Sequence, residues 1–260
     1  ELGFQQLGIT GTDISSEEPR LAAWLAQGYH GDMHYMAEHG MLRARPAELL
    51  PGTLRVLSVR MDYLPEQAGF ATNLADPAKA YISRYALGRD YHKLVRKRLK
   101  QLADKITQEV PQLAFRPFVD SAPVLERPLA QRAGLGWVGK HSLLLDHNAG
   151  SWFFLGELLV DLPLPVDTPH PGDCGSCVAC ITSCPTGAIV RPLIGNRIYG
   201  CDDCQLVCPE NRSAPLSAET DFQRRQQWQE LDLIALFSWD EARFLRNTEG
   251  SAIRRIGFER

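Results

Sequence analysis

All seven cysteines of the chain lie between residues 174 and 208. The first four belong to the stretch CGSCVACITSCP, which has the spacing C-x2-C-x2-C-x3-C-P. In this pattern the first three thiolates bind one 4Fe–4S cluster, and the cysteine before proline binds a second cluster. A secreted disulfide protein distributes its cysteines along the chain, and a zinc ribbon places a longer spacer between two CxxC pairs. The stretch therefore predicts iron–sulfur chemistry.

A second run, CDDCQLVCP, has the spacing C-x2-C-x3-C-P and is a ferredoxin half-motif without its first cysteine. The regular position for that cysteine is 198, which is isoleucine. Because the cysteine before proline in each run binds the other run's cluster, ligation is expected to cross between the runs. The predicted ligands are Cys174, Cys177, Cys180 and Cys208 for one cluster, and Cys184, Cys201 and Cys204 for the other, which lacks one ligand.

The residues before this module are expected to hold the redox centre or the substrate, because residues 1–165 are too many for a plain electron carrier. They contain no second metal motif, which favours an organic or macrocyclic cofactor held by shape and backbone contacts. A match to G-x-G-x-x-G at residues 134–139 is rejected as a dinucleotide site, because a helix is predicted before it and a strand after it. A partial D-x-H-x-x-G motif at Asp32 and His34 lacks its glycine and is interpreted as ordinary helical sequence.

Hydrophobic periodicity predicts both helices and strands. Ser15 and Glu18 are expected to form a capping box at the start of a helix. Further helices are predicted over 90–109 and 125–133, and helical segments follow residue 214. Strands are predicted at 3–9, 54–64, 112–119, 141–146 and 150–160, and a proline-rich linker at 163–173. No apolar run is long enough to cross a bilayer.

The net charge of −3, from 28 basic and 31 acidic residues, gives no general reason to expect nucleic-acid binding. Residues 84–105 are different, because they carry eight Lys or Arg and two Asp. Such a segment could contact phosphates, with Arg96, Lys97 and Lys100 as the candidate residues. It could equally be the solvated side of an amphipathic helix whose other side is apolar.

Other segments carry information beyond the cysteines. They are RYALGRDYHK, RPFVDSAPVLERPLAQRAGLGWVGKHSLLL, SWFFLGELLV, PLIGNRIYG and EGSAIRRIG. The long segment around Asp120 is not a general feature of iron–sulfur proteins. Together with the cysteine runs, these segments resemble the epoxyqueuosine reductase family over essentially the whole chain.

The resemblance implies an α+β protein in three parts. Residues 1–165 would form an α/β cobalamin domain of nitroreductase-like topology, which the family shares with reductive dehalogenases. Residues 166–213 would form a ferredoxin-like module with two 4Fe–4S clusters, and residues 214–260 the start of a helical, HEAT-like C-terminal region. The family has a longer connection between the cysteine runs that carries the eighth cysteine, so residues are expected to be absent near Val190 and Arg191.

The activity implied by the resemblance is reduction of epoxyqueuosine to queuosine in a tRNA anticodon loop. An external donor of flavodoxin or ferredoxin type would pass electrons through the clusters to base-off cobalamin, and Co(I) would act on the epoxide. The ring oxygen leaves as water and needs a proton, for which Asp120 at a strand end is the candidate acid. The alternative role of Asp120 is the N-cap of a helix that starts at Pro123.

Positions inside matching motifs suggest the cobalamin contacts. These are Arg43, Ser83, Arg84, Tyr85, Asp120, Ser121, Lys140 and His141, with the backbone of Gly136 and Gly139. The expected protein is a cytoplasmic monomer without membrane attachment. Two other functions stay open at this point, a reductive dehalogenase of a small organohalide and a ferredoxin-type electron carrier with an accessory domain.

Overall fold

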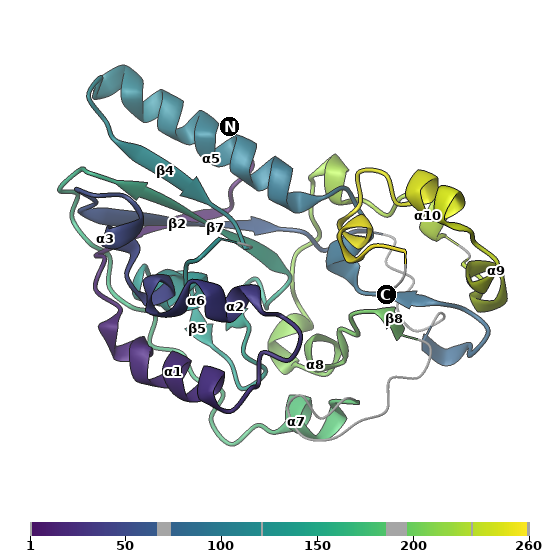
Figure 1. Ribbon diagram of the computed structural model, residues 1–260. Helices are drawn as coiled ribbons and strands as arrows, with labels where there is room; N and C mark the ends of the chain where they lie inside the picture. Colours follow the sequence, from purple (N-terminus) through teal and green to yellow (C-terminus); the bar gives the residue numbers. More distant parts are fainter. Residues whose placement is uncertain (1, 67–73, 121, 186–196, 230, 259–260) are drawn as a thin grey trace. The chain divides into compact units, whose positions relative to one another are not determined.

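The structure, a computed structural model, describes residues 2–66, 74–120, 122–185, 197–229 and 231–258 (Figure 1). The chain divides into two compact units, each built from three separate stretches of sequence. The first, called the sheet unit below, comprises Glu1–Met61, His92–Val138 and Leu155–Asp173. The second, called the cysteine unit, comprises Asp62–Tyr91, Gly139–Phe154 and Cys174–Arg260.

The sheet unit is organised around a sheet with the strand order β1-β2-β7-β4. The strands are β1 (Gln6–Thr10), β2 (Arg55–Asp62), β4 (Phe115–Phe118) and β7 (Phe153–Val160), of which Asp62, Phe153 and Phe154 are assigned to the cysteine unit. β1 pairs with β2 and β4 with β7, both in antiparallel register. β4 lies at the edge of the sheet, where Pro117 is tolerated because an edge strand need not donate every N–H.

One face of this sheet is covered by α5 (Tyr91–Glu109), as Figure 1 shows. Val95 and Leu99 on the apolar side of the helix are fully buried. A Cβ added to Gly156 of β7 would meet these two side chains at 2.9 and 3.0 Å. The helix can lie this close to the strand because residue 156 has no side chain.

The opposite face of the sheet carries an apolar cluster to which α6 (Glu126–Arg132) contributes Leu129. The other buried members of this cluster are Ile14, Val56, Phe118, Val124 and Leu159. Ser58 and Glu157 share this face with Val56 and Leu159, because every second residue of a strand points to the same side. Two polar side chains are therefore buried beside an apolar cluster.

The remaining elements of the sheet unit are short. They are the 3-10 turns η1 (Ser15–Glu17) and η2 (Gly40–Ala44), the helices α1 (Glu18–Ala26), α2 (Tyr35–Glu38) and α3 (Pro46–Leu49), and the strand β5 (Trp137–Val138). The predicted capping box is wrong: the Ser15 hydroxyl donates to Asp13 at 2.7 Å, and Glu18 accepts from Arg45 at 2.8 Å. Asp13 competes successfully for Ser15 because it also accepts the backbone N–H of that residue.

In the cysteine unit, β3 (Tyr81–Ile82) pairs in parallel with β8 (Arg197–Tyr199). Ile82 and Leu87 pack in one core with Trp228, Leu231 and Ile253. The other elements of this unit are η3 (Arg84–Ala86), β6 (Leu144–Leu145), α7 (Ala179–Ser183), α8 (Asp203–Leu206), η4 (Pro209–Asn211), η5 (Thr220–Phe222), η6 (Gln226–Trp228), α9 (Leu233–Phe237), α10 (Glu241–Asn247) and η7 (Ala252–Ile256).

The predicted mixture of helices and strands is confirmed. The glycine motif at residues 134–139 follows a helix, α6, and itself contains the short strand β5, so the rejection of a dinucleotide site is supported. The strand predicted at 141–146 is shorter, because Ser142 has a left-handed φ of 68° and only Leu144 and Leu145 are extended. Within the described ranges, every helix is too short or too polar to span a bilayer.

Candidate functional site

Asp120 lies just beyond the end of β4 in the sheet unit, and it does not cap a helix. α6 begins only at Glu126, and its N-cap residue is Leu125. The prediction that this helix starts at Pro123 is therefore wrong, and so is the N-cap role considered for Asp120. The side chain instead pairs with His92 near the start of α5, with 2.8 Å between Asp120 Oδ2 and His92 Nε2. The Asp120 side chain is 55% exposed and the His92 side chain 13%.

The backbone at Asp120 is unusual for a residue with a side chain. Its φ is 46°, in the left-handed region that Asp and Asn enter more readily than most residues. The Asp120 N–H donates to Glu126 Oε1 at 2.7 Å. Burial and the nearby Asp120 charge raise the pKa of Glu126 to about 8, while the Asp120 N–H, His92 and Arg127 act to lower it.

A second buried carboxyl group lies on the same side of the sheet. Glu157 on β7 is fully buried and accepts a hydrogen bond from the Ser58 hydroxyl on β2. Burial raises its pKa well above the ordinary value, and the interaction with Glu126 raises it further. Acidic groups that are neutral at neutral pH can store and donate protons.

Arg43, a predicted cobalamin contact, is buried in the sheet unit and bonds to backbone carbonyl groups. Its guanidinium donates to Tyr35 O at 2.8 Å, and to Met36 O and Ala122 O at 3.2 Å each. Burial lowers its pKa. These bonds give Arg43 a structural role in connecting α2 to the chain that follows Asp120. The predicted contact Ser121 lies outside the described residues.

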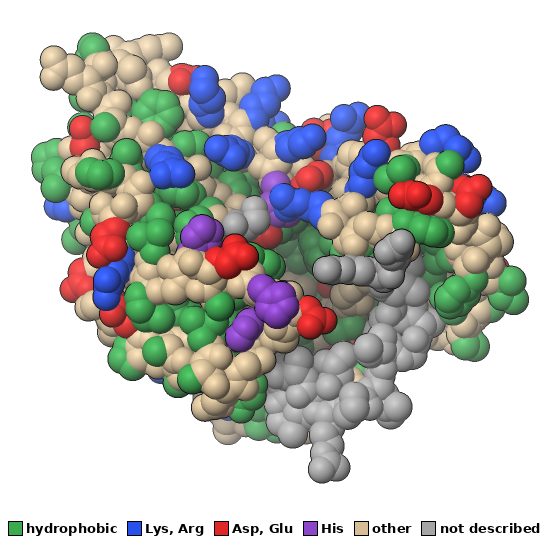
Figure 2. Space-filling model, viewed as in Figure 1, with side chains coloured by type: hydrophobic (Ala, Val, Ile, Leu, Met, Phe, Trp, Pro, Cys, Tyr) green, Lys and Arg blue, Asp and Glu red, His purple; other side chains and the backbone are tan. Residues whose placement is uncertain are grey.

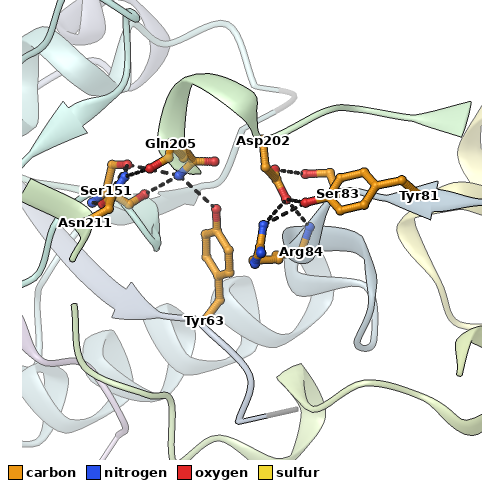
Figure 3. A network of polar contacts seen from close by, with 8 residues as sticks. All are labelled: Tyr63, Tyr81, Ser83, Arg84, Ser151, Asp202, Gln205 and Asn211. Atoms are coloured by element: carbon orange, nitrogen blue, oxygen red, sulfur yellow. Dashed lines mark hydrogen bonds and ion pairs between the residues drawn. The ribbon is translucent and has the colours of Figure 1, made fainter. Parts of the chain in front are cut away.

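In the cysteine unit, Asp202 is the centre of a buried polar network (Figure 3). Its carboxylate accepts hydrogen bonds from Tyr81 Oη at 2.9 Å, from the Ser83 hydroxyl, and from Arg84 N and Nη1 at 2.8 and 3.2 Å. Arg84 is 1% exposed, and its guanidinium also lies 4.9 Å from the Trp152 ring. Two predicted cobalamin contacts, Ser83 and Arg84, are thus bonded to the residue that follows Cys201.

The same figure shows a second network around Gln205, the residue that follows Cys204 in the sequence. Gln205 Nε2 donates to Ser151 O and Oγ at 3.0 Å, and to Tyr63 Oη at 3.4 Å. Asn211 donates to Gln205 O at 2.7 Å and accepts the Ser151 N–H at 2.6 Å. Buried, satisfied polar networks of this kind restrict a segment to one arrangement. The second cysteine run is therefore held from both sides.

Two of the cysteines, Cys180 and Cys208, are buried. Burial and the charges of Cys174 and Cys180 raise the pKa of Cys208, so these thiols from both runs interact. No three His, Cys, Asp or Glu side chains of the described residues converge on one metal ion. A 4Fe–4S cluster does not require that, because its thiolates bind different iron atoms.

A second interacting group is formed by Cys184, Cys201 and Cys204. Burial is the main cause that raises the pKa of Cys204 to about 12. The charges of Cys201, Cys180 and Cys184 contribute to this rise. Burial also raises the pKa of Cys201, with a contribution from Cys184. Thiols that resist ionisation become thiolates when a metal centre binds and displaces their protons. The donor set therefore fits iron–sulfur clusters.

Lys140, another predicted cobalamin contact, bonds to the loop of the first cysteine run. Its Nζ donates to Gly175 O at 2.7 Å and to Cys177 O at 3.0 Å. Gly175 has a φ of 47°, which glycine adopts without strain. The lysine thus brings a positive charge to the loop between two predicted cluster ligands.

His141 presents a buried hydrogen-bond donor. Burial lowers its pKa to about 4, so the ring is neutral at neutral pH. Its Nδ1 accepts the Leu143 N–H at 3.1 Å, which leaves the proton on Nε2. Nε2 is buried and has no hydrogen-bond partner among the described residues. A bound group with an acceptor atom would satisfy it, and cobalamin carries such acceptors in its amide side chains.

The other predicted cofactor residues are placed as follows. Tyr85 is half-buried and packs against the rings of Tyr91 and Tyr199, at centroid distances of 6.1 and 5.8 Å. Gly136 has a φ of 153°, and a Cβ at Gly139 would lie 2.6 Å from Leu145 Cδ1. Both glycines are therefore required by local backbone geometry or packing.

The basic residues of α5 are exposed along one side of the helix, and Figure 2 shows Lys and Arg side chains gathered over it. Arg96, Lys97 and Lys100 belong to this side, and Lys100 pairs with Asp104 at 3.5 Å. The predicted apolar side is confirmed, since Val95 and Leu99 are buried. Arg84 does not belong to the basic surface, because it is buried against Asp202.

Sequence reasoning missed His92, Glu126, Asp202 and Gln205. His92 and Glu126 do lie within segments that carry the family resemblance, and Asp202 lies between two cysteines. No spacing rule marks any of them, because each acts on a residue that is close only in the folded chain.

Comparison with known sequences gives relatives that match this chain over its whole length. A family model described as epoxyqueuosine reductase QueG, DUF1730, matches residues 43–121. The epoxyqueuosine reductase of Vibrio cholerae serotype O1 is 64% identical over 285 residues, which cover 100% of this chain and 77% of that protein. The epoxyqueuosine reductase of Escherichia coli K12 is 62% identical over 283 residues, covering 99% of this chain and 75% of that protein. These matched stretches exceed the 260 residues of the chain, so the relatives contain residues without a counterpart here.

Solved structures show the same fold. A crystal structure of a selenomethionine-labelled epoxyqueuosine reductase has a TM-score of 0.85 at 24% identity and covers 98% of this chain and 75% of that one. A crystal structure of epoxyqueuosine reductase with an epoxyqueuosine-modified tRNA-Tyr stem loop has a TM-score of 0.86 at 24% identity, covering 96% and 73%. With sequence identity above 60% over its whole length, the chain belongs to the epoxyqueuosine reductase family.

Proposed function

We propose that this chain reduces the epoxide of epoxyqueuosine in a tRNA anticodon loop to the alkene of queuosine. The observation that carries this proposal is the 64% identity to an epoxyqueuosine reductase over the complete chain. Both carbon–oxygen bonds of the epoxide break, a carbon–carbon double bond forms, and the oxygen leaves as water. The reaction therefore consumes two electrons and two protons.

The cysteines are proposed to hold two 4Fe–4S clusters with crossed ligation. Cys174, Cys177, Cys180 and Cys208 hold one cluster, and Cys184, Cys201 and Cys204 the other. The interaction of Cys208 with Cys174 and Cys180 supports this assignment, although Cys204 also interacts with Cys180. The eighth ligand is expected near Val190 and Arg191, which lie outside the described residues.

We further propose that the chain binds base-off cobalamin. When these cofactors are bound, the clusters supply electrons, and the reduced cobalt serves as the reductant of the epoxide. His141 would donate its Nε2–H to the cofactor, and Tyr85 and the backbone of Gly136 and Gly139 would line it. For Arg43, Ser83, Arg84 and Lys140 the hydrogen bonds in the structure favour support of the surrounding loops. Ser121 remains a predicted contact.

Asp120 is proposed to protonate the leaving oxygen. Its exposed carboxyl group can reach a bound substrate, and its pairing with His92 fixes the side-chain orientation. His92, which is less exposed, can return a proton to Asp120 after each turnover.

The tRNA is proposed to contact the basic side of α5 through Arg96, Lys97 and Lys100. The three-part layout, 1–165, 166–213 and 214–260, also remains a proposal, because the two compact units each draw on more than one of these parts. We further propose a cytoplasmic monomer that receives electrons from a flavodoxin or ferredoxin.

The test is anaerobic purification with cobalamin, followed by iron and cobalt counting and single-turnover assays on epoxyqueuosine tRNA. Conversion to queuosine tRNA is the expected result. Turnover of a small organohalide but not of tRNA would indicate a dehalogenase instead, and absence of a corrinoid spectrum would indicate an electron carrier.

A further inference from the structure

The backbone conformation of Asp120 needs a cause. The residue has a φ of 46°, which costs energy for any residue with a Cβ. It is also highly exposed, so packing does not hold it in place. Specific bonds must therefore keep Asp120 in this conformation.

Two of the bonds that hold Asp120 come from different helices. His92 near the start of α5 binds the side chain at 2.8 Å. Glu126 at the start of α6 binds the backbone, with 2.7 Å between Asp120 N and Glu126 Oε1. All three residues belong to the sheet unit.

Glu126 stands on a rigid support. The next turn of α6 places Leu129 and Ala130 in the core, both fully buried. The residue before Glu126 donates its N–H to Arg43 O at 3.1 Å, and Arg43 binds Ala122 O in return. Glu126 is therefore the anchored partner of the bond to Asp120.

We propose that Glu126 is a positioning residue for the proton donor Asp120. Its carboxyl group holds the Asp120 N–H, so the loop keeps the left-handed conformation that directs the Asp120 side chain toward His92. This inference rests on the proposed role of Asp120 as the proton donor.

The protonation state of Glu126 suits this role. Its pKa of about 8 leaves it mostly neutral at neutral pH. The groups that act on it are Asp120, His92 on α5, Arg127 on α6 and Glu157 on β7. A neutral carboxyl group accepts the N–H through its carbonyl oxygen and adds no negative charge beside Asp120.

The test compares Glu126→Gln, which keeps a neutral carbonyl acceptor, with Glu126→Ala, which removes it. The first readout is hydrogen exchange of the Asp120 amide in the cofactor-free chain. In the Ala variant this amide should exchange faster than in wild type by a factor on the order of ten, which is the effect of losing one hydrogen bond. In the Gln variant its exchange rate should stay near that of wild type. Glu126→Met serves as a second variant of similar length if Ala does not fold.

The second readout is single-turnover reduction of epoxyqueuosine tRNA. Turnover should fall on the order of tenfold or more in the Ala or Met variant with tRNA affinity unchanged, and Gln should restore most of it. A Gln variant as impaired as Ala would overturn the proposal, because it would show that Glu126 transfers a proton. Unchanged exchange in Ala and Met would overturn it too. If wild type itself does not reduce the tRNA, the proposed function fails, whereas the exchange result still decides whether Glu126 holds the loop.

Discussion

At the scale of single residues, Asp120 is bound at two atoms by two helices. His92 binds its carboxyl group and Glu126 binds its N–H. A helix cap would need the carboxylate to accept an N–H from the first turn of α6, and that turn begins six residues later with Leu125 as its cap. The carboxyl group of Asp120 is therefore bound by His92 and does not cap α6.

Asp120→Asn should remove the acidic proton and change little else. Asn enters the left-handed region as readily as Asp, so the free energy of unfolding should be nearly unchanged. Single-turnover reduction of epoxyqueuosine tRNA should fall by a factor on the order of 10² or more, the usual effect of losing a general acid.

The control for this variant is its cofactor content, measured as iron, cobalt and the spectrum of reduced cobalt. All three should match wild type. Near-normal turnover would remove Asp120 from the mechanism and make Tyr85 or a bound water the next candidate donor.

At the scale of elements, the two opposite sides of α5 differ in character. Its apolar side covers the sheet through Val95 and Leu99, and its exposed side carries Arg96, Lys97 and Lys100. A packed helix holds such charges at fixed spacing, which suits a phosphate backbone. Burial of one side does not test binding by the other, so the tRNA contact stays a prediction.

Replacing Arg96, Lys97 and Lys100 with Ala should weaken tRNA binding and flatten its salt dependence, because fewer counterions are released. Cobalamin content should not change. The matched control is Arg20→Ala, whose side chain on α1 is 82% exposed and should leave the salt slope alone. An unchanged slope in the triple variant would show that this side of α5 is only solvated.

The loop of the first cysteine run depends on Lys140 for both position and charge. Lys140→Gln can keep a donor to the loop carbonyls but removes the positive charge, so the reduction potential of one cluster should fall. Lys140→Arg should keep it near wild type. Because the side chain is exposed, the difference should shrink at high salt.

The measurement is a redox titration of both clusters followed by electron paramagnetic resonance. Equal shifts in the Gln and Arg variants would mean that loop geometry, and not charge, sets the potential. The shift is expected in the cluster assigned to the first run, whose loop Lys140 binds. A shift confined to the cluster assigned to Cys184, Cys201 and Cys204 would contradict this prediction.

At the scale of the whole molecule, the proposed cluster ligation combines two sequence runs whose thiols interact in the fold. Cys208 interacts with Cys174 and Cys180 of the first run. It does so although it lies 24 residues beyond Cys184, the last cysteine of that run. Asp202, Gln205 and Asn211 hold the second run in place from both sides.

Crossed ligation predicts a specific pattern of iron loss. Cys177→Ala and Cys208→Ala should each lose the same cluster, about four irons, and the double variant should lose no more. Cys177→Ala combined with Cys184→Ala should lose both clusters. Iron counting after anaerobic reconstitution checks this, and additive loss in the Cys177 and Cys208 pair would rule out crossing.

Buried carboxyl groups should also shape the pH dependence of stability. The raised pKa of Glu157 means that the folded chain retains a proton that the unfolded chain releases above its ordinary pKa of about 4.3. Stability is therefore lost as pH rises from that value toward the raised pKa. Glu157→Gln should reduce the fall in Tm as the pH rises above roughly 4.3, whereas the exposed control Glu109→Gln should not. Equal falls in wild type and Glu157→Gln would contradict the raised pKa.

The sequence by itself determined the features that depend on neighbours along the chain. The cysteine spacing indicates iron–sulfur ligation, the periodicity of residues 90–109 predicts α5, and the long motif around Asp120 indicates the family, which the full-length relatives confirm. These signals are local, because a ligand loop or a helix face is encoded within a few turns of chain.

Only the tertiary structure decided which distant side chains meet. It paired Asp120 with His92, replaced the expected N-cap with Leu125, and turned Arg84 from a surface charge into the buried partner of Asp202. Arg84 and Asp202 lie 118 residues apart in sequence. Such pairs are fixed by packing and by the need to satisfy every buried polar group, and both conditions arise only when separate stretches of chain come together.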